Sequence, residues 1–408
     1  MKGFRDFYPE QKRIQNFIFK VWRKIAKRYG YLEIDGPILE PIEIYKKSGE
    51  EIPEQMYTLT DKAKRKLALR PELTPTLARM ITQNKSLSKP IKWFSISRCL
   101  RYESPQAGRL REFFQFNIDF LGTKSIKADA EIILTSIKIM QEFRLTEKDF
   151  YIRISNRKLM QDLLKSINIK EKNFKDIQRI LDKICKYKKE DIKRELLKKG
   201  LKEKQISSLF KILKITSLNK IKIKSKGLEE LKELFNYLKS LNILKYCKLD
   251  LSIMRGFDYY TSTIFEVFDK TKKYRAIAGG GRYDELAKNC PGVGYGMGDV
   301  VLELFLKSKN KIPEINPNLV FIIPINTFEK SMKIAEQLRK NNINVSIDLM
   351  NRSLSKNLNY ANKEKIPYVL LIGKKELKSK RLKLRNMQTG KEVLLTLPKI
   401  IKFLKKNL

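Results

Sequence analysis

The sequence predicts an α+β protein: a large first part with a mixed, mostly antiparallel sheet flanked by helices, and a smaller α/β part at the end. Residues 92–102 and 111–121 are two strand-like runs joined by a polar loop with a glycine, which is typical of an antiparallel hairpin. Residues 165–245 carry long Lys-rich helical patterns without proline, which indicate an inserted helical module. From residue 318 on, strand-like and helical runs alternate as β-α-β-α-β, which favours a small, mostly parallel sheet.

The other elements of the first part follow from local patterns. Residues 11–30 predict an amphipathic helix, because apolar residues recur there at helical spacing and Gly30 is a natural stop. A short strand broken at Gly36-Pro37 follows. The stretch 276–288, AIAGGGRYDELAK, predicts a strand, a glycine turn and a helix. The stretch 292–307, GVGYGMGDVVLELFLK, predicts a glycine-rich strand that runs into an apolar helix.

Length and linker composition set the domain organisation. The chain has 408 residues, enough for two or three domains with ample cores. The segment IPEINPN at 312–318 carries two prolines and is expected to be a linker. We therefore expect a first domain at 1–316, with the insertion at 165–245, and a second domain at 317–408.

The charge balance points to a polyanionic partner. Lys and Arg number 87 against 45 Asp and Glu, a formal net charge of +42. The insertion contributes 24 − 10 = +14 of this charge, and residues 317–408 contribute 20 − 6 = +14. Nucleic acid is the first candidate partner and an acidic membrane surface the second. A set of merely solvated Lys-rich faces is the alternative for both segments.

Several residue types are missing, and their absence excludes classes of chemistry. There are no histidines, which excludes Ser-His-Asp and Cys-His nucleophile systems and His-ligated zinc. The four cysteines form no Cys-x-x-Cys pair, so no protein metal site is predicted, and they are typical of buried thiols in a reducing cytosol. No run approaches 18 apolar residues, and the N-terminus lacks the apolar core of a secretory leader. We expect a cytoplasmic protein without a membrane span.

The second strand of the hairpin carries an unusual polar face. Period-2 geometry places Phe114, Phe116, Ile118 and Phe120 on one face, which we expect to be buried. The opposite face carries an aromatic, an amide and a carboxylate in register, and the preceding strand ends in Arg and Glu two residues apart. An ordinary exposed sheet face with cross-strand ion pairs is the alternative. The polar set is Arg101, Glu103, Arg111, Phe113, Gln115, Asn117 and Asp119.

Three further segments carry the same kinds of side chain. LALRPELTPTLAR places Arg70, Glu72 and Thr74 around a proline, where the preceding residue is disfavoured in a helix. MRGFDYYTSTIFEVFD and AGGGRYDEL add further arginines, acids and tyrosines. Neither of the two common glycine-rich nucleotide-binding loops occurs in the chain.

Together these segments resemble the histidyl-tRNA synthetase family, a class II aminoacyl-tRNA synthetase. The resemblance runs nearly end to end and includes an α/β C-terminal domain; RGxDYY together with AGGRYD is specific to this family and its close paralogues. It implies ATP-dependent activation of L-histidine to histidyl-adenylate and transfer to the 3′ end of tRNA(His). It also implies Mg²⁺ and a homodimer, with helix 11–30 and the strand ending near Pro37 at the interface. The segments are KGFRDFYP, LRPELT, RYESPQAGRLREFFQFNIDFLG, RGFDYYTSTIFE and AGGGRYDEL.

The resemblance implies a role for each matching residue. Arg255 and Arg101 would be catalytic, with Arg255 bridging the amino-acid carboxylate and the α-phosphate. The ATP contacts would be Arg101, Glu103 and Arg109, with Phe113 stacking on adenine. The histidine contacts would be Glu72 and Thr74 for the amino group, and Gln115, Asp119, Tyr259, Tyr260 and Tyr283 around carboxylate and imidazole. No protein general base is needed, because cationic clamps and Mg²⁺ assist the displacement of pyrophosphate.

One segment departs from the family pattern. In GYGMGDVVLEL, Val300 and Val301 stand where the third class II motif expects an acid and an arginine that grips the terminal phosphates of ATP. We read this GMGD form as a lineage variant. Our hypothesis is that Arg109 and a neighbouring Lys or Arg take over the γ-phosphate contact.

Two rival functions fit the same fold. One is a regulatory paralogue that senses histidine, although such paralogues lack the C-terminal domain and have eroded RGxDYY segments. The other is a non-catalytic RNA-binding protein, suggested by the net charge and by Val301. A histidine-free chain also lacks any side chain with an unperturbed pKa near neutrality, so we expect pH effects near 6–7 to arise from the substrate imidazole.

Overall fold

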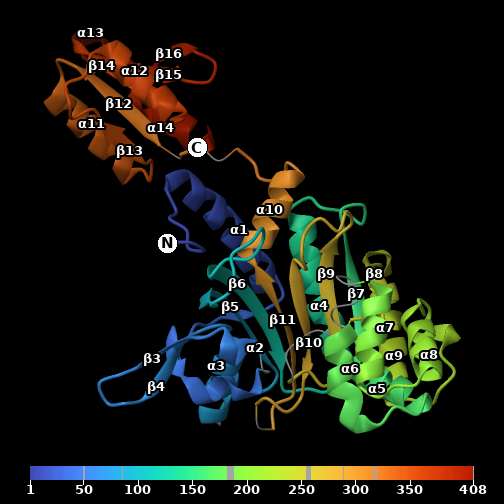
Figure 1. Ribbon diagram of the computed structural model, residues 1–408. Helices are drawn as coiled ribbons and strands as arrows, with labels where there is room; N and C mark the ends of the chain where they lie inside the picture. The colour runs from blue at the N-terminus through green and yellow to red at the C-terminus, as the bar shows by residue number, and fades with distance from the viewer. Residues whose placement is uncertain are drawn as a thin grey trace. The chain divides into compact units, whose positions relative to one another are not determined.

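The computed structural model describes residues 1–48, 51–84, 86–181, 188–253, 259–287, 289–314, 316–317 and 319–407. The chain forms two compact units, Met1–Pro313 and Glu314–Leu408, and the division falls within the proline-containing stretch 312–318 (Figure 1).

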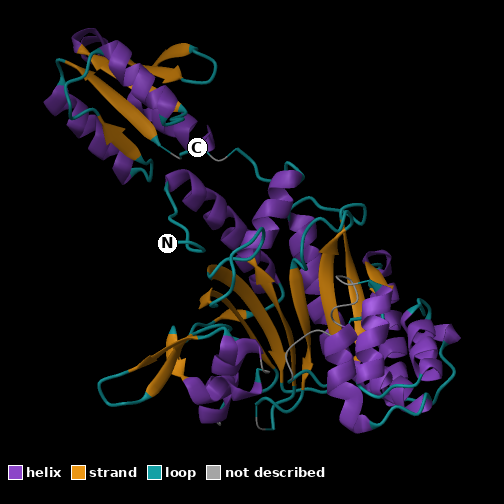
Figure 2. Cartoon of the chain, viewed as in Figure 1, coloured by secondary structure: helices purple, strands orange, loops and turns teal. Residues whose placement is uncertain are grey.

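The first unit is built on an eight-stranded sheet with the order β1-β5-β6-β11-β10-β9-β7-β8. Its strands are drawn in orange in Figure 2. The β1–β5 and β7–β8 pairs are parallel and the other neighbouring pairs are antiparallel, so the mixed, mostly antiparallel sheet is confirmed. The strands are β1 (Leu32–Glu33), β5 (Ile91–Leu100), β6 (Glu112–Leu121), β7 (Phe150–Asn156), β8 (Cys247–Leu249), β9 (Thr263–Asp269), β10 (Ala278–Tyr283) and β11 (Gly292–Gly298).

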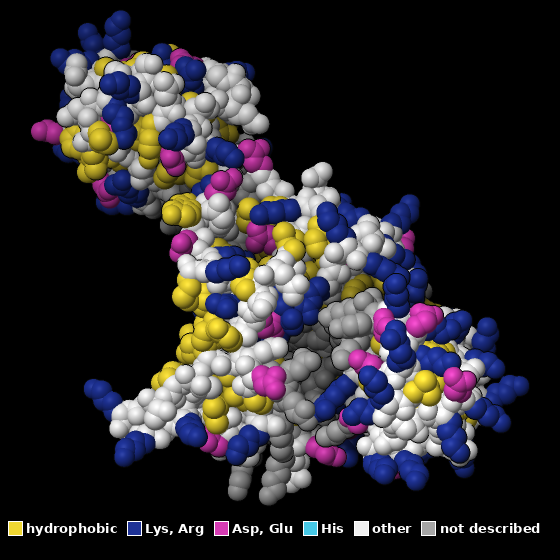
Figure 3. All heavy atoms as spheres, viewed as in Figure 1, with side chains coloured by type: hydrophobic (Ala, Val, Ile, Leu, Met, Phe, Trp, Pro, Cys, Tyr) yellow, Lys and Arg dark blue, Asp and Glu magenta, His cyan; other side chains and the backbone are white. Residues whose placement is uncertain are grey.

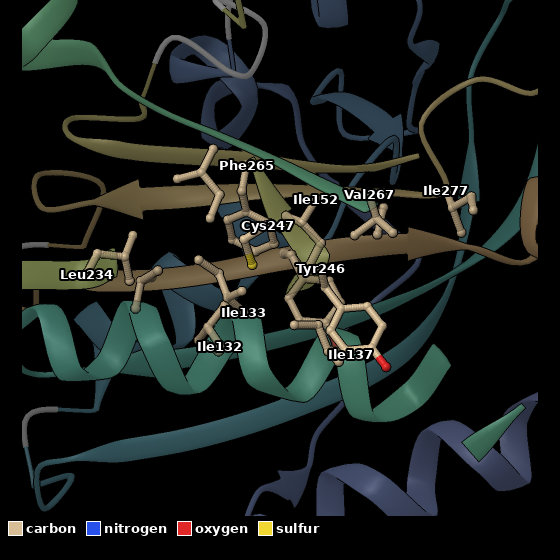
Figure 4. Close-up of a cluster of buried hydrophobic side chains, with 14 of the residues drawn as sticks. Ile132, Ile133, Ile137, Ile152, Leu234, Tyr246, Cys247, Phe265, Val267 and Ile277 are labelled. Carbon is tan, nitrogen blue, oxygen red and sulfur yellow. The ribbon is translucent and has the colours of Figure 1, made fainter. Parts of the chain in front are cut away.

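Three helices cover one face of this sheet: α1 (Pro9–Arg28), α4 (Ile126–Glu142) and α10 (Asp299–Ser308). The predicted helix at 11–30 is confirmed; most of its apolar stripe, including Trp22, is buried within its own chain, and Ile14 and Phe17 are partly buried. Side chains of α4 point toward the sheet (Figure 4), where Ile133 and Ile137 lie in one buried cluster with residues of β7 and β9. This layer leaves the opposite face of the sheet to form the candidate site.

A smaller sheet precedes the hairpin, in the order β2-β4-β3. It consists of β2 (Leu39–Pro41), β3 (Tyr57–Thr60) and β4 (Lys66–Leu69), with the short helices η1 (Ile42–Lys47) and α2 (Glu51–Glu54) between the first two. Helix α3 (Thr74–Gln83) follows β4. No pattern noted above predicts the β3–β4 hairpin. The turn from β4 into α3 matters most, because it carries Glu72 and Thr74.

The helical insertion lies between β7 and β8 (green to yellow in Figure 1). Its amphipathic helices bury leucines such as Leu209, Leu231 and Leu234 on one side, while Lys and Arg crowd its outer surface (Figure 3). The helices are α5 (Arg157–Ser166), η2 (Glu171–Asn173), α6 (Phe174–Leu181), α7 (Lys189–Lys198), α8 (Glu203–Leu213), η3 (Leu218–Lys220), α9 (Lys226–Ser240) and η4 (Leu244–Tyr246).

The stretch 276–288 differs from its prediction. Gly279, Gly280 and Gly281 are not a turn; they lie inside β10, paired to β9 on one side and β11 on the other. A Cβ at Gly280 would lie 2.2 Å from the carbonyl oxygen of Gly294, so the triplet permits close approach of neighbouring strands.

The predicted helix after that triplet is also wrong for the described residues 284–287, which form bends. Tyr283 and Gly292 are register partners, so the residues between them return the chain between two adjacent antiparallel strands. The Asp284 carboxylate accepts hydrogen bonds from the Thr261 hydroxyl (3.1 Å) and from Arg282 (3.4 Å), which holds the connection in its bent form.

The second unit has a five-stranded sheet in the order β13-β12-β14-β15-β16. The β-α-β-α-β prediction is confirmed, because β13, β12 and β14 are parallel. An antiparallel hairpin, β15–β16, extends the sheet, so "mostly parallel" describes only its first part. The elements are β12 (Val320–Ile325), α11 (Phe328–Lys340), β13 (Val345–Ile347), α12 (Leu354–Lys363), β14 (Tyr368–Gly373), α13 (Lys374–Ser379), β15 (Leu382–Asn386), β16 (Glu392–Leu395) and α14 (Leu397–Asn407).

None of the helices in the described part of the chain is long and apolar enough to span a membrane.

Candidate active site

A small cavity opens on the face of the large sheet that α1, α4 and α10 leave uncovered. Its empty space, including the part open to solvent, is about 300 Å³, and we call it the inner cavity. All seven residues predicted to contact the amino acid line it, although they come from four separate segments of the chain. Its lining is Glu72, Thr74, Gln115, Asn117, Asp119, Tyr259, Tyr260, Gly279, Tyr283, Gly294, Tyr295 and Gly296.

The alternation along β6 puts the polar side chains into this cavity. Gln115 and Asp119 line it, whereas Phe116 and Ile118 are fully buried in the hydrophobic core on the other face. Of the predicted apolar face, Phe114 and Phe120 are partly buried against the same core. The interpretation of this strand as an ordinary exposed face is therefore wrong for its central residues.

The glycines of β11 make room for the β6 side chains. Gly294 is the register partner of Asp119, and a Cβ at Gly294 would lie 2.1 Å from Oδ1 of that carboxylate. A Cβ at Gly296 would lie 2.5 Å from Nε2 of Gln115. Sequence reasoning missed this role, although the signal was present: GVGYGMG has a glycine at every second position, which places all of them on one face of the strand.

Asp119 is buried at the floor of the inner cavity. The Tyr283 hydroxyl donates a hydrogen bond to its Oδ1 at 2.5 Å. Burial raises the pKa of Asp119 to about 7. A carboxylate held in this way is a strong acceptor for a second N–H or O–H group that enters the cavity.

Glu72 is the second buried carboxylate of the inner cavity. The Tyr259 hydroxyl donates to its Oε2 at 3.1 Å, while Oε1 forms no hydrogen bond of good geometry with the described residues. Burial raises the pKa of Glu72 to about 7, although the nearby Ser48 side chain opposes this rise. An unsatisfied, buried carboxylate oxygen is costly in the empty protein and becomes favourable when a cation binds to it.

A second cavity, which we call the outer cavity, adjoins the first along β6. Its empty space, including the part open to solvent, is about 820 Å³, and all four residues predicted to contact ATP line it. Phe113 faces the outer cavity and Gln115, two residues on, faces the inner one, so the two cavities share one face of the strand. The lining is Arg101, Glu103, Gly108, Arg109, Leu110, Phe113, Glu266, Arg275, Ala276, Gly298, Val300 and Val301.

The predicted ATP contacts are held by specific interactions. The Arg101 guanidinium lies 5.1 Å from the centre of the Phe113 ring and donates a hydrogen bond to the Pro71 carbonyl at 3.0 Å. Arg101 also opposes the rise in the pKa of Glu72 through its charge, which couples the two cavities electrostatically. Arg109 forms an ion pair with the buried Glu103 carboxylate.

The start of α10 is fixed beside the outer cavity. The Asp299 carboxylate accepts a hydrogen bond from the Phe114 backbone N–H at 2.9 Å and forms an ion pair with Arg5 at 2.7 Å. This anchors the N-terminal KGFRDFYP segment and β6 to the first turn of the helix. Val300 and Val301, the residues of the departing motif, therefore hold defined places in the cavity wall.

The predicted site and the observed cavities differ in two ways. Arg255, the predicted bridging arginine, lies outside the described residues. Among the charged and aromatic lining residues, Glu266, Arg275 and Tyr295 were not predicted as site residues. Arg275 and Glu266 come from the β9–β10 region, and Arg275 lies outside every motif that carries the resemblance.

Comparisons with known proteins agree along the whole chain. The family model described as histidyl-tRNA synthetase matches residues 3–298, and the one described as anticodon binding domain matches residues 319–407. A relative from Thermoplasma volcanium, named histidine--tRNA ligase, is 38% identical over 423 residues, which cover 100% of this chain and 98% of the relative. The chain belongs to the histidyl-tRNA synthetase family.

Solved structures of the histidyl-tRNA synthetase family have the same fold. The crystal structure of histidyl-tRNA synthetase from Nostoc sp. PCC 7120 aligns with a TM-score of 0.85 at 26% identity, covering 100% of this chain and 98% of that one. A Bacillus halodurans structure, titled as an ATP phosphoribosyltransferase regulatory subunit/histidyl-tRNA synthetase, aligns with a TM-score of 0.75 over 89% of this chain and 95% of its own. At 22% sequence identity, this similarity supports a shared fold and no conclusion about function.

Proposed function

We propose that this chain activates L-histidine with ATP to histidyl-adenylate and transfers the histidyl group to the 3′ end of tRNA(His). The observation that carries the proposal is the pair of adjoining cavities: a small one with two buried carboxylates and a larger one with arginines and an aromatic ring in its wall. The family to which the chain belongs supports the same reaction.

In the inner cavity, we assign Glu72 and Thr74 to the ammonium group of the amino acid. The Oε1 atom of Glu72 supplies an unused acceptor for this cation. Asp119, oriented by Tyr283, receives an imidazole N–H, while Gln115, Tyr259 and Tyr260 complete the wall. An apolar side chain of similar size would give Asp119 no donor besides Tyr283, which is the physical basis for selecting histidine.

In the outer cavity, we assign Phe113 to adenine stacking and Arg101, Glu103 and Arg109 to polar contacts with ATP. Arg101 lies against Phe113 and acts on Glu72 through its charge, so we assign its guanidinium to the point where the α-phosphate meets the amino acid. Arg255 remains a candidate for the bridging contact, on the sequence match alone. Substituting Arg109 by Ala would then raise the ATP requirement sharply.

Mg²⁺ fits this site as a companion of ATP. No cluster of three or more acidic or cysteine ligands occurs in the described ranges, so the protein has no cage of its own there. Glu103 and Glu266 line the outer cavity, and Mg²⁺ is commonly held by one or two carboxylates together with substrate phosphates. The ion would neutralise charge on the departing pyrophosphate.

The reaction is a displacement that needs positioning more than proton transfer. The histidine carboxylate attacks the α-phosphorus, an oxygen–phosphorus bond forms, and the bond to pyrophosphate breaks. Two anions must be held close together, and Arg101 lowers the cost of this approach. The attacking carboxylate is already ionised, so no general base is required, which agrees with a chain that has no histidine.

The basic surfaces are assigned to tRNA. A groove on the insertion is lined by lysines that include Lys170, Lys172, Lys202 and Lys204, and we assign it to the acceptor arm. In the second unit, Phe328, Lys330, Arg352 and Lys374 line a cavity at the carboxyl ends of the parallel strands, which we assign to anticodon bases. A cytoplasmic homodimer is part of the same proposal.

Histidine-dependent ATP–pyrophosphate exchange tests the function. Exchange that rises with histidine supports the synthetase. Binding of histidine without exchange supports the sensing paralogue. The absence of both exchange and histidine binding supports an RNA-binding protein. The Asp119→Ala variant should lose exchange with histidine, while Asp6→Ala, an aspartate change outside both cavity linings, should keep it. Exchange by the wild type with no dependence on histidine would refute the proposal.

A further inference from the structure

The outer cavity contains one cation to which the assignments above give no role. Among its described lining residues, the charged side chains are Arg101, Arg109, Arg275, Glu103 and Glu266. Arg101 packs on Phe113, and Arg109 is paired with Glu103. Arg275 is the third positive group of this wall.

The wall at the start of α10 cannot supply a cation. Val301 is 8% exposed, and a Cβ at Gly108 would lie 3.2 Å from its Cγ2, so the loop between β5 and β6 rests closely on this side chain. Val300 lies beside it in the same lining. The position where the family pattern expects an arginine is thus an apolar support for the loop.

Arg275 is carried on a turn whose neighbouring residues are fixed. The Tyr274 backbone N–H donates to the Asp269 carboxylate at 3.0 Å, and the Tyr274 ring meets Phe305 of α10 edge-on, with ring centroids 6.3 Å apart. The Ile277 N–H donates to the Val267 carbonyl at 2.8 Å. The turn is therefore anchored to α10 and β9 on both sides of Arg275, which limits the positions that its half-buried side chain can reach.

We propose that Arg275 binds the terminal phosphates of ATP, in place of an arginine at position 301. This inference rests on the proposed function and names the group that completes its nucleotide site. The lining without Arg275 would hold two arginines and two glutamates, a net charge of zero facing a triphosphate. A planar guanidinium suits bidentate contact with phosphate oxygens. An arginine on the β9–β10 turn can make this contact as well as an arginine on α10.

Binding measurements with two nucleotides test the proposal on the full chain. The probes are ATP and a non-hydrolysable sulfamoyl analogue of histidyl-adenylate, which lacks the β- and γ-phosphates. Arg275→Ala should weaken ATP binding at least about tenfold, because alanine cannot donate charge-assisted hydrogen bonds to phosphate, and should leave binding of the analogue unchanged. Arg275→Lys should recover part of the affinity. Lys273→Ala, which removes one exposed charge from the same turn, is the matched control and should bind ATP as the wild type does.

Each outcome decides the role of Arg275. Selective weakening of ATP binding supports it. Unchanged ATP affinity overturns it, because Arg275 would then not contact the terminal phosphates. An equal decrease in affinity for ATP and for the analogue also overturns it, because Arg275 would then act only on the fold of the site. If the wild type shows no histidine-dependent exchange while Arg275→Ala still binds ATP selectively more weakly, the proposed function fails and the phosphate contact stands.

Discussion

At the scale of single residues, the inner cavity places two carboxyl groups where water solvates them poorly. Burial raises the pKa of both Glu72 and Asp119 to about 7. Each is fully ionised only above neutrality in the empty protein, and each becomes protonated as the pH falls below 7. This corrects the expectation drawn from the absence of histidine, that only the substrate imidazole would titrate near neutrality.

Affinity for the amino acid should therefore depend on protein groups between about pH 6 and 8. A histidine analogue whose ring does not titrate near neutrality should bind about tenfold more weakly at pH 6 than at pH 8 for each carboxylate that must be ionised. Binding of this analogue, measured by calorimetry across that range, checks the prediction. A flat profile would assign the pH dependence near neutrality to the substrate imidazole.

At the scale of elements, the site depends on two glycine-rich strands. In β11 the alternate glycines give space to Gln115 and Asp119, and in β10 they allow three strands to lie close together. The two strands thus carry small residues on the face that forms the cavity, while Val293 and Met297 of β11 fill the core on the opposite face. The same residue type that suggests turns in a sequence here leaves room for the side chains of the neighbouring strand.

Two substitutions in β10 test why the strand contains three glycines: to let neighbouring strands approach closely, or to give the backbone conformational freedom. Gly280→Ala should destabilise the protein by about 3 kcal/mol or more, since its Cβ would meet the Gly294 carbonyl oxygen at 2.2 Å. Gly279→Ala should stay within about 1 kcal/mol of the wild type, because its nearest neighbour would be 3.8 Å away. Denaturant unfolding measures both. Equal losses of unfolding free energy in the two variants would mean that the glycine triplet provides backbone flexibility and not close strand packing.

At the scale of the whole molecule, the segments that line the two cavities are not the segments that carry most of the net positive charge. Both cavities lie within the unit Met1–Pro313. The insertion and residues 317–408 together supply +28 of the net charge of +42, by adding the two values of +14 counted from the sequence. Amino-acid activation and tRNA contact should therefore respond to different substitutions.

The groove on the insertion provides the test of that separation. Replacing Lys170, Lys172, Lys202 and Lys204 by Ala should raise the KM for tRNA in charging and leave histidine-dependent exchange unchanged. The slope of log affinity against log salt concentration should fall by about 0.7–0.9 for each phosphate that the variant no longer neutralises. An unaltered tRNA KM would make these lysines a solvated face only.

Exposed apolar residues indicate where a second copy would bind. Of the two segments predicted at the interface, α1 buries most of its apolar face within its own chain, whereas Leu32, on the edge strand β1, is 68% exposed. Wild-type protein should have twice the 48.0 kDa chain mass in light scattering. Leu32→Glu should shift it to the monomer mass, whereas Leu241→Glu, on the insertion, should not. A monomeric wild type would contradict the dimer.

The sequence by itself determined the elements whose signal is local and the family whose motifs are contiguous. Helix α1, the β5–β6 hairpin and the parallel strands of the second unit follow from periodicity, and the alternation along β6 already separated Asp119 from Phe116. Only the tertiary structure decided that Glu72 and Asp119 share a cavity, that burial moves their pKa values to neutrality, and that Arg275 and Val301 line the same cavity. Desolvation and strand proximity depend on atoms brought together from distant segments, and no local pattern encodes them.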